Sequence, residues 1–227
     1  MMSFTVIGTP FSTFTRTITL GLHYKGLPFN QISVLPHSET ADEYHPFGYL
    51  PTLAIETETG GKEGTLKLRE SLAIVRYFDR VAPQPTLCIS AGDGRALIEE
   101  QMWEFVSMVA SYGFPAIEFG VVKPRMALTN EGKATDAEIR ESINTGVSRS
   151  RRFLTIIEEA MSPEGYAFGE KLSWADFFLY PLLADLRAIP EGELLSERML
   201  AWMELMDKLE AVKATTPGTL SAGARPS

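Results

Sequence analysis

Short apolar runs and helically spaced apolar residues alternate in the first third of the chain. Residues 4–8 (FTVIG) are β-branched and apolar and end at a glycine, which predicts a short strand. After this strand, apolar residues recur every four positions: Phe14, Ile18 and Leu22. Ser12 is a good N-cap in front of this stripe, and Lys25 and Gly26 supply a cation and a C-cap behind it. The pattern therefore predicts a first helix that begins at Ser12.

Three more strands and a second helix are predicted before the pattern changes. Residues 29–34 (FNQISV) and 52–55 (TLAI) have the composition of strands. A long hairpin through Gly60-Gly61 leads into a fourth strand at residues 67–69. Apolar residues then take helical spacing over residues 72–81 and stop before a proline. The predicted order is βαβ followed by ββα.

A break in periodicity separates this part from a second part with helical spacing. Residues 83–95 (PQPTLCISAGDGR) are rich in Pro, Gly and Ser, which predicts a linker. Helical stripes follow at residues 97–109 and 139–157, and a capping box at Thr135 and Glu138 opens the second of them.

Two more helices are predicted near the end of the chain. Residues 173–176 (SWAD) form another capping box in front of the apolar run at residues 177–183, and a last helical stripe covers residues 200–209. We therefore predict four parts: an α/β domain of residues 1–83, a linker of residues 84–93, an all-α domain of residues 94–213 and a flexible tail of residues 214–227.

The composition narrows the classes of partner. A chain of 227 residues with 44% hydrophobic residues can bury a substantial core in one or two domains of roughly 100 to 200 residues. The formal net charge of -8 opposes binding to nucleic acid, which needs a concentrated field of Lys and Arg. We find neither a basic leader nor an apolar stretch near the roughly 20 residues that span a bilayer. We therefore expect a soluble, cytoplasmic protein with no nucleic-acid or membrane partner.

Cysteine and histidine are too few for a disulfide framework or a metal site. A single cysteine, Cys88, excludes an internal disulfide. It lies in the predicted linker, and we expect it to behave as a small, buried, apolar residue. The three histidines, at His23, His37 and His45, leave no spacing for structural zinc. We expect no metal.

Ser12 is the first candidate for chemistry. A hydroxyl at a helix N-terminus can donate to an anion such as a thiolate, while the free N–H groups and the helix dipole add positive potential. Lowering a thiol pKa of about 8.5 by roughly two units requires about 2.7 kcal/mol, within reach of one charge-assisted hydrogen bond plus a helix terminus. The alternative is that Ser12 only caps the helix, and Thr13 and Thr15 offer rival hydroxyls.

Two further pairs of residues stand where strands and helices begin. Leu50-Pro51 precedes a predicted strand, where a cis proline would turn the backbone of Leu50 outward for a ligand. Ser71 and free N–H groups at a helix start can hold a carboxylate, and Glu70 can hold an ammonium group. Taken alone, each pair also fits an ordinary role as an edge proline or a plain helix start.

Four segments resemble motifs of one known family. GTPFSTFTRTI (residues 8–18) resembles the G-x-P-x-S-x-x-x-R pattern of phi-class glutathione transferases, whose serine is the catalytic one. HPFGYLPTL (residues 45–53) resembles the segment with the family's cis proline, and LRESLAIVRYF (residues 68–78) the segment that binds the γ-glutamyl end. FGEKLSWADFFLYP (residues 168–181) resembles the segment that caps a helix in the family's α-helical domain. The resemblance spans both predicted domains and keeps their order.

The resemblance implies a fold and an activity. The fold is a thioredoxin-like α/β N-terminal domain plus an all-α C-terminal domain that contributes the electrophile site. The activity is that of a detoxification enzyme and homodimer, in which Ser12 holds the thiol of glutathione, the co-substrate, as a thiolate that attacks apolar electrophiles. Six residues are implied to contact glutathione: Ser12, His37, Leu50, Pro51, Glu70 and Ser71.

Several positions depart from the family's pattern. Tyr49 stands where glutamine or lysine is usual, and the hairpin at residues 57–66 is long. The mostly polar stretch of residues 36–45 lacks the lysine that often meets the glycine carboxylate, which leaves His37 as its substitute. Phe47 resembles a residue that inserts into the partner subunit in some classes, and packing within its own loop is the alternative.

Two other functions fit the same resemblance. One is a transferase-like protein that binds apolar ligands, or regulates another protein, without useful turnover. The other is an isomerase or ether-cleaving enzyme that uses the same thiolate on a specific substrate. LHYKGLPF (residues 22–29) resembles stretches in fungal etherase-related and ligand-binding members, so the subclass stays open. The thiol-disulfide branches carry a cysteine where Ser12 stands, which disfavours disulfide reduction.

Overall fold

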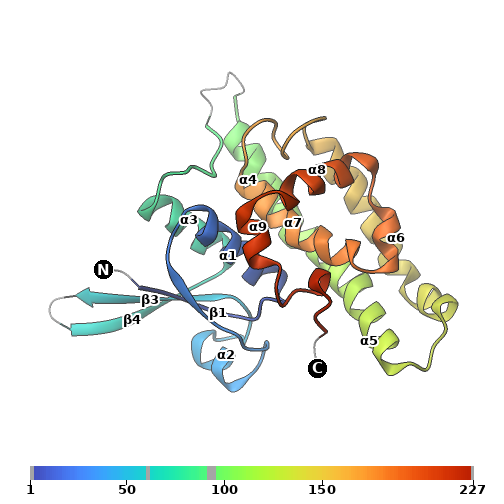
Figure 1. The fold of residues 1–227 in the computed structure, drawn as a ribbon, viewed down its shortest axis with the longest axis horizontal. Helices are drawn as coiled ribbons and strands as arrows, with labels where there is room; N and C mark the ends of the chain where they lie inside the picture. Colours follow the sequence, from blue (N-terminus) through green and yellow to red (C-terminus); the bar gives the residue numbers. More distant parts are fainter. Residues whose placement is uncertain (1–2, 60–61, 91–95, 226–227) are drawn as a thin grey trace. The chain divides into compact units, whose positions relative to one another are not determined.

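Figure 1 shows the computed structural model of the chain, which describes residues 3–59, 62–90 and 96–225. The chain divides into two compact units. One comprises Met1–Leu87 together with Lys208–Ser227, and the other comprises Cys88–Asp207.

The first unit is organised around a four-stranded sheet with the strand order β2-β1-β3-β4. β1 (Ser3–Ile7) pairs parallel with β2 (Phe29–Ile32) and antiparallel with β3 (Thr52–Thr59). β4 (Lys62–Arg69) continues the sheet antiparallel to β3. The predicted Gly60-Gly61 turn lies outside the described residues.

Three helices complete the βαβαββα order of a thioredoxin-like domain, which confirms the predicted fold class of this unit. They are α1 (Thr13–Tyr24), α2 (Glu39–Tyr44) and α3 (Ser71–Val81). The sequence did not predict α2, because residues 36–45 are mostly polar. Within α2 only Ala41 is buried, so the helix lacks the apolar stripe from which a helix is predicted.

The core of the first unit lies between the sheet and its helices. Its fully buried apolar side chains include Val6, Ile18, Leu20, Leu22, Leu53, Ile74 and Phe78. Every residue of α1 from Thr15 to Leu22 is buried, because α3 contacts α1 and α9 also packs against it. The helix is therefore enclosed rather than exposed on one face.

The C-terminal residues belong to the first unit, which differs from the predicted all-α domain of residues 94–213 and tail of residues 214–227. After Asp207 the chain forms α9 (Glu210–Thr215) and a short 3-10 helix, η5 (Leu220–Ala222). Leu220 is only 2% exposed. A few apolar side chains therefore dock a segment whose Thr, Pro, Gly and Ser content predicted a tail.

The second unit is built from helices. They are α4 (Ile98–Met108), α5 (Lys123–Glu131), α6 (Asp136–Ala160), α7 (Trp174–Arg187), the 3-10 helix η4 (Pro190–Leu194) and α8 (Glu197–Asp207). All residues of α7 from Trp174 to Leu186 are buried. α7 is therefore the central helix of this unit, and α4, α8 and η4 contact it. The expected helical C-terminal domain is confirmed.

One long helix in this unit is interrupted by wider turns. α4 continues through two π-helical segments, η2 (Val109–Gly113) and η3 (Pro115–Val122), into α5. Pro115 has no N–H to offer the carbonyl four residues earlier, which interrupts the α-helical ladder. η3 also crosses α6 closely, since a methyl group on Gly146 would lie 1.9 Å from the carbonyl oxygen of Gly120. Neither feature follows from apolar spacing.

The same helix is apolar enough to meet a membrane-span criterion by length and composition. It runs over Ile98–Glu131, has a mean hydropathy of 1.5 in its most apolar window, and half of that window is buried inside the protein. From the sequence we expected no such stretch. The helix packs against α6 and α7, so its apolar character reflects the core of the second unit.

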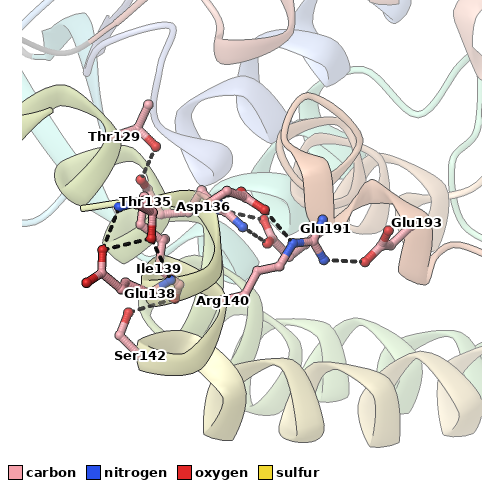
Figure 2. Close-up of polar contacts among 10 residues, drawn as sticks. Thr129, Thr135, Asp136, Glu138, Ile139, Arg140, Ser142, Glu191 and Glu193 are labelled. Carbon is pink, nitrogen blue, oxygen red and sulfur yellow. Dashed lines mark hydrogen bonds and ion pairs between the residues drawn. The ribbon is translucent and has the colours of Figure 1, made fainter. Parts of the chain in front are cut away.

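Figure 2 shows a polar network that joins the start of α6 to η4. The buried guanidinium of Arg125 bonds to the buried carboxylate of Glu191 and to Asp136. Arg140 in turn bonds to Asp136 at 2.9 Å and to Glu193 at 2.6 Å. Hydrogen bonds from the two arginines lower the pKa of Asp136, and the carboxylates raise the pKa of Arg140. The network is a structural connection between helices of the second unit.

Candidate functional site

The pairing register of the sheet brings the three predicted site segments to one edge. Ile7, the last residue of β1, pairs with Thr52, the first residue of β3, and Thr52 also pairs with Arg69, the last residue of β4. The turn to Ser12, the Leu50-Pro51 dipeptide and the Glu70-Ser71 dipeptide are the chain segments that adjoin these three residues. They therefore gather at the same end of the three strands.

The turn after β1 depends on a glycine. A methyl group on Gly8 would lie 2.3 Å from Oγ1 of Thr15, so β1 and α1 approach closely only because no side chain stands there. The backbone N–H of Gly8 donates to the carbonyl of Ile32 at 2.9 Å. The side chain of Gln31 donates to the carbonyl of Gly8 at 2.8 Å. β2 therefore fixes both backbone groups of Gly8.

Ser12 is the N-cap of α1, as the sequence predicts. Its backbone is extended, and its Oγ accepts a long hydrogen bond of 3.4 Å from the backbone N–H of Thr15. The side chain is partly exposed, and among the described residues its O–H proton has no acceptor. Ser12 can therefore donate to an anion at the helix N-terminus, where the helix dipole favours negative charge.

The two rival hydroxyls are buried. Thr13 is 5% exposed and Thr15 is 0% exposed. Oγ1 of Thr15 faces Gly8 and has no hydrogen-bond partner among the described residues. Of the three hydroxyls, that of Ser12 is the accessible one.

The Leu50–Pro51 peptide bond is cis. Leu50 is half-buried, and among the described residues its backbone N–H has no hydrogen-bond partner. The dipeptide directly precedes β3, so this backbone donor is free to pair with an extended ligand at the sheet edge.

Glu70 has an unusual backbone conformation at the start of α3. Its φ of 65° and ψ of 118° lie in a region that residues other than glycine rarely adopt. Its side chain is 79% exposed, and its Oε1 lies 3.7 Å from Nε2 of His45. Ser71 follows as the first residue of α3 and is half-buried. The helix N-terminus and both side chains are thus available to a zwitterionic group.

His45 is a residue whose position sequence reasoning missed. It is 4% exposed, and its Nδ1 accepts from the backbone N–H of Phe47 at 3.1 Å. In the neutral ring the proton then resides on Nε2, which faces Glu70. His45 therefore ties the loop before Leu50 to the start of α3. A histidine inside the segment of residues 45–53 was the available signal in the sequence, but residue spacing does not reveal that Glu70 lies beside it.

His37 lies in the loop between β2 and α2. It is exposed, its φ is 59°, and its backbone N–H donates to the carbonyl of Gly48 at 2.8 Å. Its ring stands 5.1 Å from the ring of Tyr49, edge to face. Among the described residues no contact joins its side chain to Ser12 or Glu70, so the structure attaches His37 to the loop but not to the other candidates.

Two basic residues of β4 hold α2 beside the sheet, a role that no pattern in the sequence predicted. Nζ of Lys67 donates to the carbonyl of Glu43 at 2.9 Å and stands 4.1 Å from the ring centroid of Tyr44. Nε of Arg69 donates to the carbonyl of Tyr44 at 2.8 Å. These bonds satisfy the last carbonyls of a six-residue helix.

The sequence matches the two domains of one protein family. Residues 6–86 match the family described as "Glutathione S-transferase, N-terminal domain", and residues 136–216 match "Glutathione S-transferase, C-terminal domain". Glutathione S-transferase F7 of Arabidopsis thaliana is 26% identical over 220 residues, covering 89% of this chain and 94% of its own. Glutathione S-transferase F6 of the same plant is 23% identical over 215 residues, with the same coverage.

Solved structures show the same fold. Glutathione transferase F7 from Populus trichocarpa superposes with a TM-score of 0.74 at 24% identity, covering 95% of this chain and 98% of that one. FzlA from C. crescentus gives a TM-score of 0.76 at 16% identity, with 94% and 91% coverage. At these sequence identities the structural similarity shows the fold alone.

Proposed function

Because the chain belongs to the glutathione S-transferase family, we propose that it binds glutathione at this edge of the sheet, with Ser12 holding the thiol as a thiolate. The thiolate attacks an electrophilic carbon of an apolar substrate, and the leaving group or the neighbouring atom takes the displaced electron pair. No covalent enzyme intermediate is needed. The observation that carries the proposal is the register that joins Ile7, Thr52 and Arg69, because it gathers Ser12, Leu50 and Ser71 at one edge.

Each end of the tripeptide has a proposed contact. The backbone of Leu50, turned by Pro51, pairs with the backbone of the cysteinyl residue. Ser71 and the N-terminal amides of α3 hold the γ-glutamyl carboxylate, and Glu70 holds the ammonium group. His37 is the proposed partner of the glycine carboxylate.

The energetic demand on Ser12 is modest. A bound thiol whose pKa falls by roughly two units is stabilised as thiolate by about 2.7 kcal/mol. A hydrogen bond to a charged group contributes about 1.5–3 kcal/mol, and a helix N-terminus adds about 0.3–1 kcal/mol. The free hydroxyl proton of Ser12 and the start of α1 together meet that demand.

The pH dependence of conjugation with a generic aromatic electrophile tests the proposal. Ser12→Ala should lower kcat/KM near neutral pH about 10- to 100-fold and move its rise with pH toward the pKa of free glutathione. Thr13→Val is the matched control, because it removes the neighbouring, buried hydroxyl and should leave the profile unchanged. A loss in Thr13→Val without a loss in Ser12→Ala would reassign the role.

The same assay separates the enzyme from a ligand-binding protein. If conjugation with the wild-type protein is no faster than with free glutathione while apolar dyes still bind, the function is ligand binding rather than catalysis. If generic electrophiles react poorly but Ser12→Ala still raises the pKa of the bound thiol, the thiolate serves an isomerase or ether-cleaving reaction on a specific substrate.

The proposal includes a homodimer in the cytoplasm that takes part in detoxification. Two exposed aromatic side chains on the loop after α2 support the dimer, since Phe47 is 70% exposed and Tyr49 is 58% exposed. Large exposed aromatic residues are enriched at protein interfaces.

A further inference from the structure

The C-terminal segment contacts the turn that carries Ser12 from two sides. Gly218 packs on Pro10, because a methyl group added to Gly218 would lie 3.2 Å from Cβ of Pro10. Nη2 of Arg16 donates to Oγ1 of Thr216 at 3.1 Å. Pro10 precedes Ser12 by two positions and Arg16 follows it by four, so the contacts bracket the N-terminus of α1.

The contact with Arg16 reaches Ser12 through the backbone. Arg16 is 2% exposed, and its backbone N–H donates to the carbonyl of Ser12 at 2.9 Å, the first hydrogen bond of α1. A buried guanidinium is stable only where its N–H groups find acceptors, so the hydroxyl of Thr216 helps to fix its place. That hydroxyl donates in turn to the carbonyl of Val212 at 2.8 Å, which leaves its lone pairs for Arg16.

The segment itself is anchored. Thr219 and Leu220 are each 2% exposed, and the hydroxyl of Thr219 donates to the carbonyl of Thr216 at 2.7 Å. Gly218 has a φ of +79°, a conformation that glycine adopts without strain. The chain from Thr216 to Leu220 is therefore a fixed turn of the first unit, which we name the C-terminal brace.

We propose that the C-terminal brace sets the position of Ser12 and thereby the pKa of the bound thiol, with Arg16 and Thr216 as positioning residues. The inference rests on the proposed role of Ser12. The strength of a hydrogen bond to a thiolate depends on the placement of the donor, and displacements of about 1 Å at a reacting group reduce rates strongly. Leu50 and Ser71 stand on other elements, so binding of glutathione itself does not depend on the brace.

Thr216→Val tests the brace, because it keeps the shape of the side chain and removes the hydroxyl. We expect the pKa of bound glutathione to rise by about half a unit to one unit and kcat near neutral pH to fall about three- to tenfold, with KM for glutathione changed by less than about twofold. Thr216→Ser restores the hydroxyl and should restore both values.

Thr155→Val is the matched control. Thr155 is exposed on α6, and its hydroxyl donates to the carbonyl four residues earlier at 3.1 Å, as that of Thr216 does. It therefore reports the loss of such a bond alone and should leave the pKa and kcat unchanged. Gly218→Ala is a second variant. Its methyl group would press against Pro10, while the hydroxyls of Ser12 and Thr216 are both retained. We expect it to lower kcat in the same direction as Thr216→Val.

Amide hydrogen exchange of the free protein separates failure of the brace from failure of the proposed function. In Thr216→Val the amides of Ser12 and Arg16 should exchange faster than in the wild type, while those of α6 should not. If the wild-type protein does not lower the pKa of bound glutathione, the role of Ser12 fails and exchange alone decides whether the brace holds the turn. Unchanged exchange, or an unchanged thiol pKa in Thr216→Val when the wild type does lower it, overturns the inference.

Discussion

Glu70 combines a rare backbone conformation with an exposed charge. Its φ is 65°, its side chain is 79% exposed, and His45 is 3.7 Å away. Residues held in such conformations cluster at ligand sites, where the surrounding structure stabilises them. The exposed carboxylate is the group that we propose holds the ammonium group of glutathione.

Glu70→Gln should therefore weaken binding of glutathione without unfolding the protein. We expect KM for glutathione to rise about tenfold, because a hydrogen bond to a charged group contributes about 1.5–3 kcal/mol. kcat at saturation should stay within about twofold of the wild type.

Glu43→Gln is the control for Glu70→Gln, since it removes one exposed negative charge from the same unit. Glu43 is 67% exposed and lies 3.6 Å from Lys67. Steady-state kinetics with varied glutathione measure both variants. An equal rise of KM in both would mean that net charge, rather than a contact of Glu70, governs binding.

Sequence reasoning succeeded at this scale where the signal is local. A hydroxyl before a helical stripe identifies Ser12 as a cap, and the resemblance of residues 45–53 to a family segment implied the cis bond at Pro51, which the structure has. It missed His45, Gln31 and the Gly8 contact, because their partners are brought close by the folding of the chain rather than by regular spacing. The proposed chemistry of Ser12 and the glutathione contacts stay predictions.

At the scale of elements, the start of α7 depends on one buried carboxylate. Asp176 accepts from the backbone N–H of Ser173 at 2.9 Å, from that of Ala167 at 2.7 Å and from Nε1 of Trp202 at 2.9 Å. Burial raises the pKa of Asp176, and these hydrogen bonds oppose the rise. The capping box therefore also connects α7 to α8 and to the loop before it.

Asp176→Ala should destabilise the protein by about 3 kcal/mol or more. It removes a cap, which costs about 0.5–2 kcal/mol, and it leaves buried donors unsatisfied at about 1–3 kcal/mol each. Glu138→Ala is the matched control, because Glu138 completes the capping box of α6 in an exposed position and should cost about 1 kcal/mol or less. Denaturant unfolding measures both, and equal losses would show that burial of Asp176 adds nothing.

Elements with an apolar stripe or β-branched run were predictable, and the rest were not. The strand, helix, strand order at the start and the capping boxes of α6 and α7 follow from sequence pattern. α2 buries only Ala41, the π-helical segment η3 begins at Pro115, and Gly120 meets Gly146 where η3 contacts α6. Such features depend on tertiary contacts that a single sequence does not display.

At the scale of the whole molecule, the second unit is inserted into the first along the chain. Residues after Asp207 return to complete the first unit, where α9 packs on α1. Composition alone suggested a tail there, because contacts between distant parts of a chain leave no periodic signal. The two-domain order was predictable from four family-like segments, and the return of the chain was not.

The proposed homodimer gives a prediction at this scale. Phe47→Ala should raise the dissociation constant of the dimer at least about tenfold, because buried aromatic anchors commonly contribute about 2 kcal/mol or more at interfaces. Ile156→Ala, which also truncates an exposed apolar side chain, is the control and should leave the constant unchanged. Sedimentation over a range of concentrations measures both. A wild-type monomer, or a Phe47→Ala dimer as tight as the wild type, would contradict the prediction.

The decisive measurement is a spectroscopic titration of the thiolate of bound glutathione. We expect a pKa about two units below that of the free thiol in the wild-type protein, returning most of the way toward the free value in Ser12→Ala. Thr13→Val should titrate like the wild type. An equal pKa of bound thiol in the wild type and in Ser12→Ala would mean that Ser12 does not stabilise the thiolate.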